Sequence, residues 1–223
     1  MTHIRITGDG PPLLLISGLT RDLHAWDHLA AHLQGRTVIT YDAPGIGDGG
    51  PARVMTIRTL AEYAAKVLDE VGVKCADVLG FSHGGAVAQQ LAHSHPTRVD
   101  RLILAGTTCG IGGVLGDLGA LLALRQPGTE WWAAHWRTLA ISGWSSLPFL
   151  GTLTQPTLVV CGEGDRVCPV ANSRVLADRI PDARLVVLDD AGHDLQDEEV
   201  ALELAWHVSK FLSEPIEIEE KAS

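Results

Sequence analysis

Basic residues are scarce in this chain. Lys and Arg number 17 against 27 Asp and Glu, so the formal net charge at pH 7 is −10. Proteins that bind nucleic acid contact the phosphates through clustered Lys and Arg side chains, and the sequence contains no such cluster. The composition therefore argues against a nucleic-acid partner.

Long apolar runs are missing as well. No run is long enough to span a bilayer, and the first five residues lack the apolar stretch of a secretory signal. We therefore expect a cytoplasmic protein without a membrane span. The 223 residues, 46% hydrophobic and 20% charged, suffice for one globular domain with a sizeable core.

Cysteines are few, and their spacing is not that of a metal site. They are Cys75, Cys109, Cys161 and Cys168. This spacing favours reduced thiols that pack as small apolar residues. His24, His28 and His32 recur at helical spacing, but without an accompanying set of carboxylates we interpret them as a solvated helix face. We expect no metal.

What the chain does contain is a regular alternation of apolar strands and amphipathic helices. Such alternation implies a parallel α/β sheet with right-handed crossovers and helices on both faces. In these sheets ligands bind beyond the carboxyl ends of the strands. The expected strands are 2–7, 13–16, 37–41, 75–79, 102–105, 157–161 and 184–188, and the expected helices are 22–33, 56–71, 82–94, 170–179 and 197–212.

Residues 80–84 read Gly-Phe-Ser-His-Gly and match the pattern G-x-S-x-G between an expected strand and an expected helix. In this context the motif forms a strained turn, the nucleophile elbow, which exposes a serine hydroxyl at the sheet edge. Gly80 and Gly84 leave room for the neighbouring strand and helix. The pattern therefore predicts that Ser82 is a nucleophile.

A serine hydroxyl needs a base, usually a histidine that is held by an acid. On this kind of sheet the order along the chain is Ser, then Asp or Glu, then His. Asp165 follows the strand at 157–161 and is the predicted acid. Glu163 is the competing acid, although it lies closer to the strand.

His193 follows the strand at 184–188 and is the predicted base. The 28 residues that separate it from Asp165 correspond to about one helix and one strand, so both should reach the same edge of the sheet. His83 is nearer to Ser82 in sequence, but it begins the helix and is poorly placed to turn back to the hydroxyl.

Acyl transfer also requires hydrogen-bond donors for the oxyanion. The residue after the nucleophile supplies one backbone N–H, here that of His83. The loop after the first buried strand supplies the other, and we assign it to Leu19, which follows Gly18.

Together these residues resemble the α/β-hydrolase superfamily over about residues 12–212, and within it the intracellular poly(3-hydroxyalkanoate) depolymerases and their esterase relatives. The resemblance implies an α/β-hydrolase fold, a Ser82–Asp165–His193 triad and no metal or organic cofactor. The segments that carry the closer resemblance are 12–18, 41–47, 82–90, 143–148 and 155–160.

The chain departs from that group at three places. His83 stands where those enzymes typically carry Trp, and Asp194-Leu195-Gln196 replaces an apolar run. The insertion between the strands ending at 105 and beginning at 157 is also short. We expect a single domain over 1–223 with a small helical cap at about 106–154 and a flexible acidic tail at about 214–223.

The cap should shape the substrate pocket. Trp132, Trp136 and Trp144 could form an apolar wall for an acyl chain, or they could pack within the cap as its own core. A short cap would leave the serine accessible to bulky or polymeric esters.

The leading expectation is a carboxylic ester hydrolase that acts on a small-molecule or polymeric ester. The same site could instead cleave a lactone, a thioester or a C–C bond beside a carbonyl, because acyl chemistry of all these kinds uses one constellation. A ligand-binding receptor or scaffold on the same fold is a third reading. The sequence leaves the oligomeric state open.

Overall fold

The computed structural model describes residues 2–113, 116 and 131–215, and for residues 131–134 it describes the backbone alone. Seven strands form one sheet in the order β1-β3-β2-β4-β5-β6-β7, and all are parallel to their neighbours except β1, which pairs antiparallel with β3. The prediction of a mostly parallel α/β sheet is therefore confirmed. The strands are β1 (Ile4–Thr7), β2 (Pro12–Ile16), β3 (Thr37–Tyr41), β4 (Ala76–Phe81), β5 (Val99–Ala105), β6 (Thr157–Gly162) and β7 (Ala183–Leu188).

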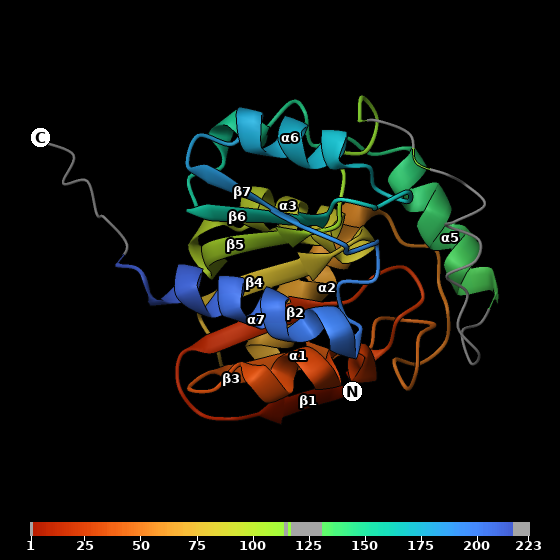
Figure 1. The fold of residues 1–223 in the computed structure, drawn as a ribbon. Helices are drawn as coiled ribbons and strands as arrows, with labels where there is room; N and C mark the ends of the chain where they lie inside the picture. Colours follow the sequence, from red (N-terminus) through yellow and green to blue (C-terminus); the bar gives the residue numbers. More distant parts are fainter. Residues whose placement is uncertain (1, 114–115, 117–130, 216–223) are drawn as a thin grey trace, which may run out of the picture.

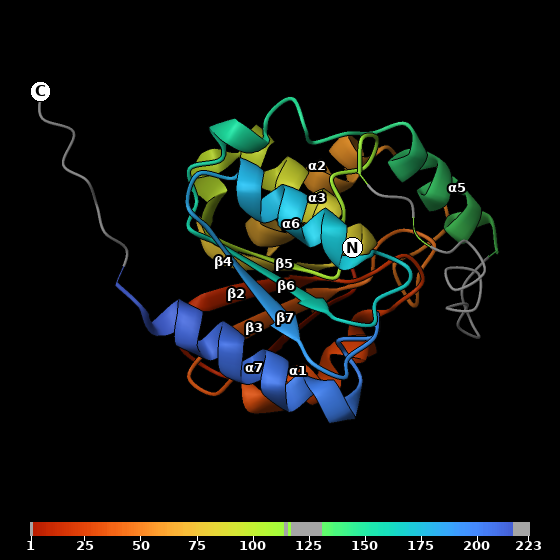
Figure 2. The same ribbon diagram turned by 45° about the horizontal axis from the view of Figure 1, so that its top comes forward.

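Helices cover both faces of this sheet (Figures 1 and 2). On one face lie α1 and α7, and on the other lie α2, α3 and α6. The α-helices of the described residues are α1 (Asp27–His32), α2 (Ile57–Glu70), α3 (His83–Ser94), α5 (Trp131–Ser142), α6 (Val170–Arg179) and α7 (Glu198–Ser213).

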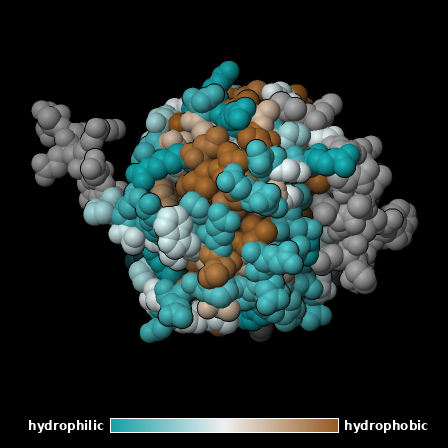
Figure 3. All heavy atoms as spheres, in the orientation of Figure 1, coloured by the Kyte–Doolittle hydropathy of each residue, from teal (hydrophilic) through white to brown (hydrophobic). Residues whose placement is uncertain are grey.

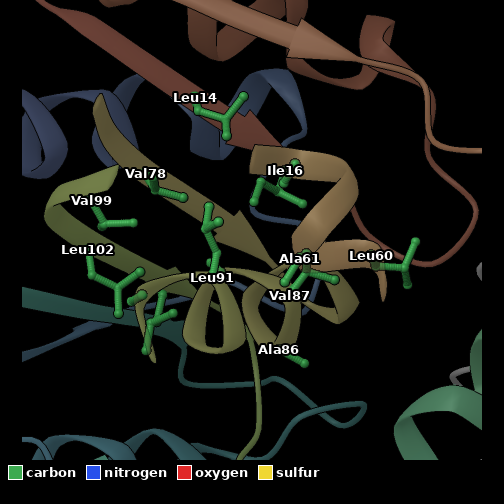
Figure 4. Close-up of a cluster of buried hydrophobic side chains, with 14 of the residues drawn as sticks. Leu14, Ile16, Leu60, Ala61, Val78, Ala86, Val87, Leu91, Val99 and Leu102 are labelled. Atoms are coloured by element: carbon green, nitrogen blue, oxygen red, sulfur yellow. The ribbon is translucent and has the colours of Figure 1, made fainter. Parts of the chain in front are cut away.

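The continuous apolar run of β2 supplies side chains to both layers of the core. Leu13 and Leu15 pack among residues of α1 and α7, whereas Leu14 and Ile16 pack among residues of α2 and α3 (Figure 4). Successive side chains of a strand point to opposite faces, so a strand buried on both faces has no polar alternation. This is why a four-residue apolar run predicts a central strand here.

The expected helix at 22–33 is wrong in its first turn. Residues Leu23–Trp26 form a 3₁₀ helix, and α1 begins only at Asp27. Three residues per turn place Leu23 and Trp26 on one face, and both side chains are fully buried. The tighter turn therefore buries two large side chains together.

Glu214, the first residue of the predicted tail, makes two contacts with the sheet strands. Arg101 donates a hydrogen bond to the backbone carbonyl of Glu214, and Arg184 forms an ion pair with its carboxylate at 2.5 Å. The rest of the predicted tail, from residue 216, lies outside the described residues.

The edge strand β7 is only partly covered. Figure 3 shows apolar side chains gathered on this face of the molecule, over the region of β7 and α7, with hydrophilic side chains around them. Two of the exposed apolar residues are Leu202 and Trp206 on α7.

The carboxyl ends of the parallel strands meet at one edge of the sheet, and α5 lies beyond that edge (Figure 1). Helix α5 belongs to the segment between β5 and β6. The loops after β2, β4, β5, β6 and β7 therefore converge beneath this segment.

Gly84 lies where α3 meets the end of β2, and a Cβ there would come within 2.1 Å of the Ile16 carbonyl oxygen. Backbone cannot yield as a flexible side chain can, so we expect Gly84→Ala to lower the free energy of unfolding by about 3 kcal/mol. Urea denaturation would measure this change.

Gly151→Ala is the matched control, because the nearest atom to a Cβ there is 3.9 Å away. This variant should stay within about 0.5 kcal/mol of the wild type. Equal stability of the two variants would show that the close approach at Gly84 is not a constraint.

Candidate functional site

Ser82 sits at the turn between β4 and α3 in a conformation that few side chains adopt. Its φ is 53° and its ψ −119°, and in the described part of the chain only Asp190 shares a positive φ without being glycine. The Ser82 N–H donates to the Ala105 carbonyl at 2.8 Å, and the Thr107 hydroxyl donates to the Ser82 carbonyl at 2.6 Å. Strain of this kind persists only where the surroundings hold it, and here both neighbours lie at the end of β5 or just after it.

The structure brings the Ser82 hydroxyl to His193. Ser82 Oγ lies 2.9 Å from His193 Nε2, and His193 Nδ1 lies 2.8 Å from Asp165 Oδ2. An ionised carboxylate can only accept, so the proton between His193 and Asp165 is on Nδ1. The lone pair of Nε2 is then free to accept the Ser82 proton.

Asp165 is fixed by its own loop. Its Oδ1 accepts hydrogen bonds from the N–H groups of Val167 and Cys168, each at 2.8 Å, and its side chain is fully buried. Glu163, the competing acid, is exposed. The structure therefore joins Asp165, and not Glu163, to the histidine.

Gly106 shows how closely the loops pack at this point. Its φ is +51°, and a Cβ there would lie 3.5 Å from Asp165 Oδ2 and 3.6 Å from His193 Nδ1. The turn after β5 thus passes beside the hydrogen bond between acid and base in a conformation that glycine adopts without strain.

The two predicted oxyanion donors lie on the same cavity as Ser82, because Leu19 and His83 both line it. His83 is the first residue of α3, where a backbone N–H has no acceptor within its own helix. The loop of Leu19 is tied to the histidine loop, since Arg21 pairs with Asp194 at 2.5 Å.

The His83 side chain, unlike its backbone N–H, has no part in the predicted oxyanion site and is buried near Arg137. It is 5% exposed, and burial, together with the positive charge of Arg137, lowers its pKa to about 3. The imidazole is therefore neutral at physiological pH. Its Nε2 has no hydrogen-bond partner among the described residues.

The cavity beside Ser82 has a volume of about 400 Å³, and its surface is mainly apolar. The segment between β5 and β6 provides one wall, with Thr108, Ile111 and Ile141, and the loop after β6 provides another, with Val167 and Cys168. Sequence reasoning did not single out these residues. The rule that sites lie beyond strand ends could have identified Thr108, which follows β5 by three residues.

Of the three predicted tryptophans, Trp136 and Trp144 are not among the described residues that line this cavity. Trp136 is 37% exposed and lies against His135. The Trp144 indole N–H donates to Gln90 Oε1 at 2.9 Å and its ring lies edge-on to Phe149, so its polar edge is engaged away from Ser82. The side chain of Trp132 lies outside the part of the chain that the structure describes.

In the parts of the chain that the structure describes, no three His, Cys, Asp or Glu side chains are grouped as a metal ion requires. His24 instead lies 3.3 Å from Asp27 Oδ2. No helix within the described residues is long and apolar enough to cross a membrane.

The fold and the Ser82 site together define a class of protein. The sequence profile described as the alpha/beta hydrolase fold matches residues 11–134 and 133–200, so the chain belongs to the α/β-hydrolase family. The family prediction made from the motifs is therefore confirmed.

Particular relatives include enzymes that cleave different bonds. The chain is 31% identical to a poly(3-hydroxyalkanoate) depolymerase from Ectopseudomonas oleovorans, over 82% of this chain and 77% of that protein. It is 30% identical to a 2-hydroxymuconate semialdehyde hydrolase from Pseudomonas sp. (strain CF600), over 96% of this chain and 90% of that protein. A crystal structure of a hydrolase from Pseudomonas aeruginosa PA01 superposes with a TM-score of 0.83 at 27% identity, covering 95% of this chain and 94% of that one. A hydrolase is therefore the class that both sequence and fold support.

Folding lowers the pKa of His83 from 6.5 to about 3. Below pH 6.5 the unfolded chain therefore binds a proton at His83 that the native state does not bind, so the free energy of unfolding falls as the pH falls from 6.5 towards 3. The loss should reach roughly 4–5 kcal/mol at pH 3. His83→Gln, which does not titrate, should show a correspondingly shallower fall in unfolding free energy between pH 6.5 and 4 when both proteins are denatured in urea. Parallel curves would contradict a buried, neutral His83.

Proposed function

We propose that this protein is a serine-dependent carboxylic ester hydrolase that acts on esters with an apolar acyl group. The observation that carries the proposal is a chain of two hydrogen bonds, from Ser82 Oγ to His193 Nε2 and from His193 Nδ1 to Asp165 Oδ2. Ser82, at one end of this chain, lines an apolar cavity. A hydroxyl, a neutral base and a buried acid in this order are what acyl transfer to water requires.

In the proposed reaction, Ser82 Oγ attacks the ester carbonyl while His193 Nε2 takes its proton. The N–H groups of Leu19 and His83 stabilise the resulting oxyanion. The tetrahedral species collapses and expels the alcohol, which receives the proton from His193, and an acyl group remains on Ser82.

Water completes the cycle by the same steps. His193 removes a proton from a water molecule, the hydroxide attacks the acyl carbonyl, and Ser82 leaves with the proton that His193 returns. Asp165 remains ionised and keeps His193 in the tautomer that accepts at Nε2 throughout. Each ester therefore yields one acid and one alcohol.

The segment at about 106–154 acts in this proposal as the cap, since Ile111 and Ile141 from it help to line the cavity. A cavity of about 400 Å³ is at the lower end of ligand pockets and suits an acyl chain of several carbons. The alcohol side, or the remainder of a polymer, would lie outside.

Cleavage of a C–C bond is the second candidate, because a relative at 30% identity is a 2-hydroxymuconate semialdehyde hydrolase. The two activities share the serine and differ in the leaving group, which is an alkoxide in one and a carbanion in the other. A panel of chromogenic esters and a vinylogous diketone would separate them by relative kcat/KM. Turnover of the diketone alone would overturn the ester assignment.

Replacing the proposed nucleophile tests the function directly. Ser82→Ala should lower kcat for a chromogenic ester by about 10³-fold or more and abolish labelling by a fluorophosphonate probe. Ser213→Ala, at the exposed end of α7, should behave as the wild type in both assays. A wild type that binds ligands but is neither labelled nor active would support a receptor or scaffold instead.

A bulkier side chain at Ile141 tests the acyl pocket. Ile141→Trp should lower kcat/KM for esters of six to eight carbons by roughly tenfold or more and leave acetate esters little changed, because the added ring fills the cavity.

Leu139→Trp on the same helix is the control, since Leu139 is 47% exposed and does not line the cavity. It should keep the wild-type dependence on acyl length. An identical loss for short and long esters in Ile141→Trp would count against acyl binding at this wall.

A further inference from the structure

A buried positive charge joins the segment between β5 and β6 to the main sheet. Arg137 lies on α5 with 7% of its surface exposed, and its Nη1 donates to the Leu19 carbonyl at 2.9 Å and to the Gly18 carbonyl at 3.5 Å. No Asp or Glu carboxylate within the described residues pairs with it at ion-pair distance. Burial lowers the pKa of the guanidinium to about 10, so it remains charged at neutral pH.

A charge of this kind is costly to bury, and its hydrogen-bond partners among the described residues are the backbone carbonyls of Gly18 and Leu19. Replacing such a group by an apolar residue is often neutral or stabilising in proteins. Stability alone therefore does not account for an arginine at this position, and its partners point to another role.

The two carbonyls belong to the peptide units on either side of Leu19. The Gly18 carbonyl and the Leu19 N–H are parts of the same planar trans peptide, so they point in opposite directions. A donor that holds the carbonyl on one side directs the N–H to the other. Leu19 itself lines the same cavity as Ser82 and His83.

Without a donor to the Gly18 carbonyl, the Gly18–Leu19 peptide could rotate. Gly18 precedes the peptide in question, and glycine leaves φ and ψ less restricted than any other residue. The Arg21–Asp194 pair fixes the loop further along, after Leu19, and does not act on the Gly18 carbonyl. Among the contacts of the described residues, the 3.5 Å hydrogen bond from Arg137 to the Gly18 carbonyl acts on this peptide plane directly.

The guanidinium lies apart from the cavity beside Ser82. Arg137 lines a cavity of only about 10 Å³ together with Ser17, Tyr41 and His83, which is room for a single water. It is not among the residues that line the 400 Å³ cavity.

We propose that Arg137 is a positioning residue: its guanidinium holds the Gly18–Leu19 peptide so that the Leu19 N–H faces the oxyanion, and it thereby couples α5 to the catalytic machinery. This inference rests on the proposed ester hydrolysis. It assigns to α5 a part in the chemical step, in addition to the shape of the acyl pocket.

The test compares Arg137→Ala, Arg137→Met and Arg137→Lys with Leu139→Ala, an exposed position on the same helix. Loss of one oxyanion donor costs about 10²–10³ in kcat, and a misdirected donor should cost part of this. We expect kcat to fall about 10- to 100-fold in Arg137→Ala and Arg137→Met, with KM changed less than about threefold. Arg137→Lys should recover part of the loss, and Leu139→Ala should match the wild type.

A trifluoromethyl ketone forms a tetrahedral adduct with a serine and places its oxyanion where the transition state does. Its inhibition constant should weaken across the variants in parallel with kcat/KM, which a general loosening of the fold would not produce. Thermal unfolding identifies which variants are folded. If Arg137→Ala does not fold, Arg137→Met serves in its place, because Met preserves the apolar stem of the side chain.

Three results would overturn the inference. They are an unchanged kcat in any folded variant that lacks the charge, a raised KM with unchanged kcat, or an unchanged inhibition constant for the ketone. Failure of the proposed function is distinct, because the wild type would then show no ester turnover or Ser82→Ala would retain it.

Discussion

The contact on which the site depends is the close approach of α3 to the strands beside it. Gly84 lies against the end of β2, and at Gly80 a Cβ would come within 2.4 Å of the Gly84 carbonyl oxygen. Because both positions lack a side chain, α3 can begin at His83, only two residues after the end of β4 at Phe81, and the chain turns sharply at Ser82. The positive φ of Ser82 follows from this packing, and it directs the hydroxyl to the edge of the sheet where His193 lies. Backbone geometry therefore determines where the hydroxyl lies before any polar contact forms.

Much of this arrangement follows from the order of residues along the chain. Parallel strands bring their carboxyl ends together, so Asp165 and His193 could be paired with Ser82 from their places after β6 and β7. The sequence also favoured Asp165 over Glu163 because Glu163 lies closer to the strand, and in the structure Asp165 contacts His193 while Glu163 is exposed. The extent of β4 and the first turn of α1 differ from expectation by a few residues, as boundaries do when tertiary burial decides them.

The segment between β5 and β6 was less predictable for a physical reason. Its contacts depend on how an irregular stretch docks onto the sheet, and no periodic pattern encodes that docking. Trp144 is a residue type that often lines apolar pockets. In the structure, however, its indole N–H donates a hydrogen bond to Gln90 on α3. Arg137 follows Trp136 and is the one Lys, Arg, Asp or Glu residue of α5, so its charge suggests exposure. Only the tertiary structure reveals that Arg137 is the buried neighbour of the two and Trp136 the exposed one.

The separation of the contacting residues along the chain has a consequence for how the molecule is made. Ser82 and His193 lie 111 positions apart, and Arg21 and Asp194 lie 173 apart, so segments from all three thirds of the polypeptide must be present before these contacts can form. Contacts of such long range form late, because the entropy of closing a large loop is lost before they are gained. A nascent chain that has not yet released β7 and the loop after it from the ribosome cannot form the contact between Ser82 and His193. The order of the strands along the chain therefore delays completion of the Ser82 site until the last third of the chain has been synthesised.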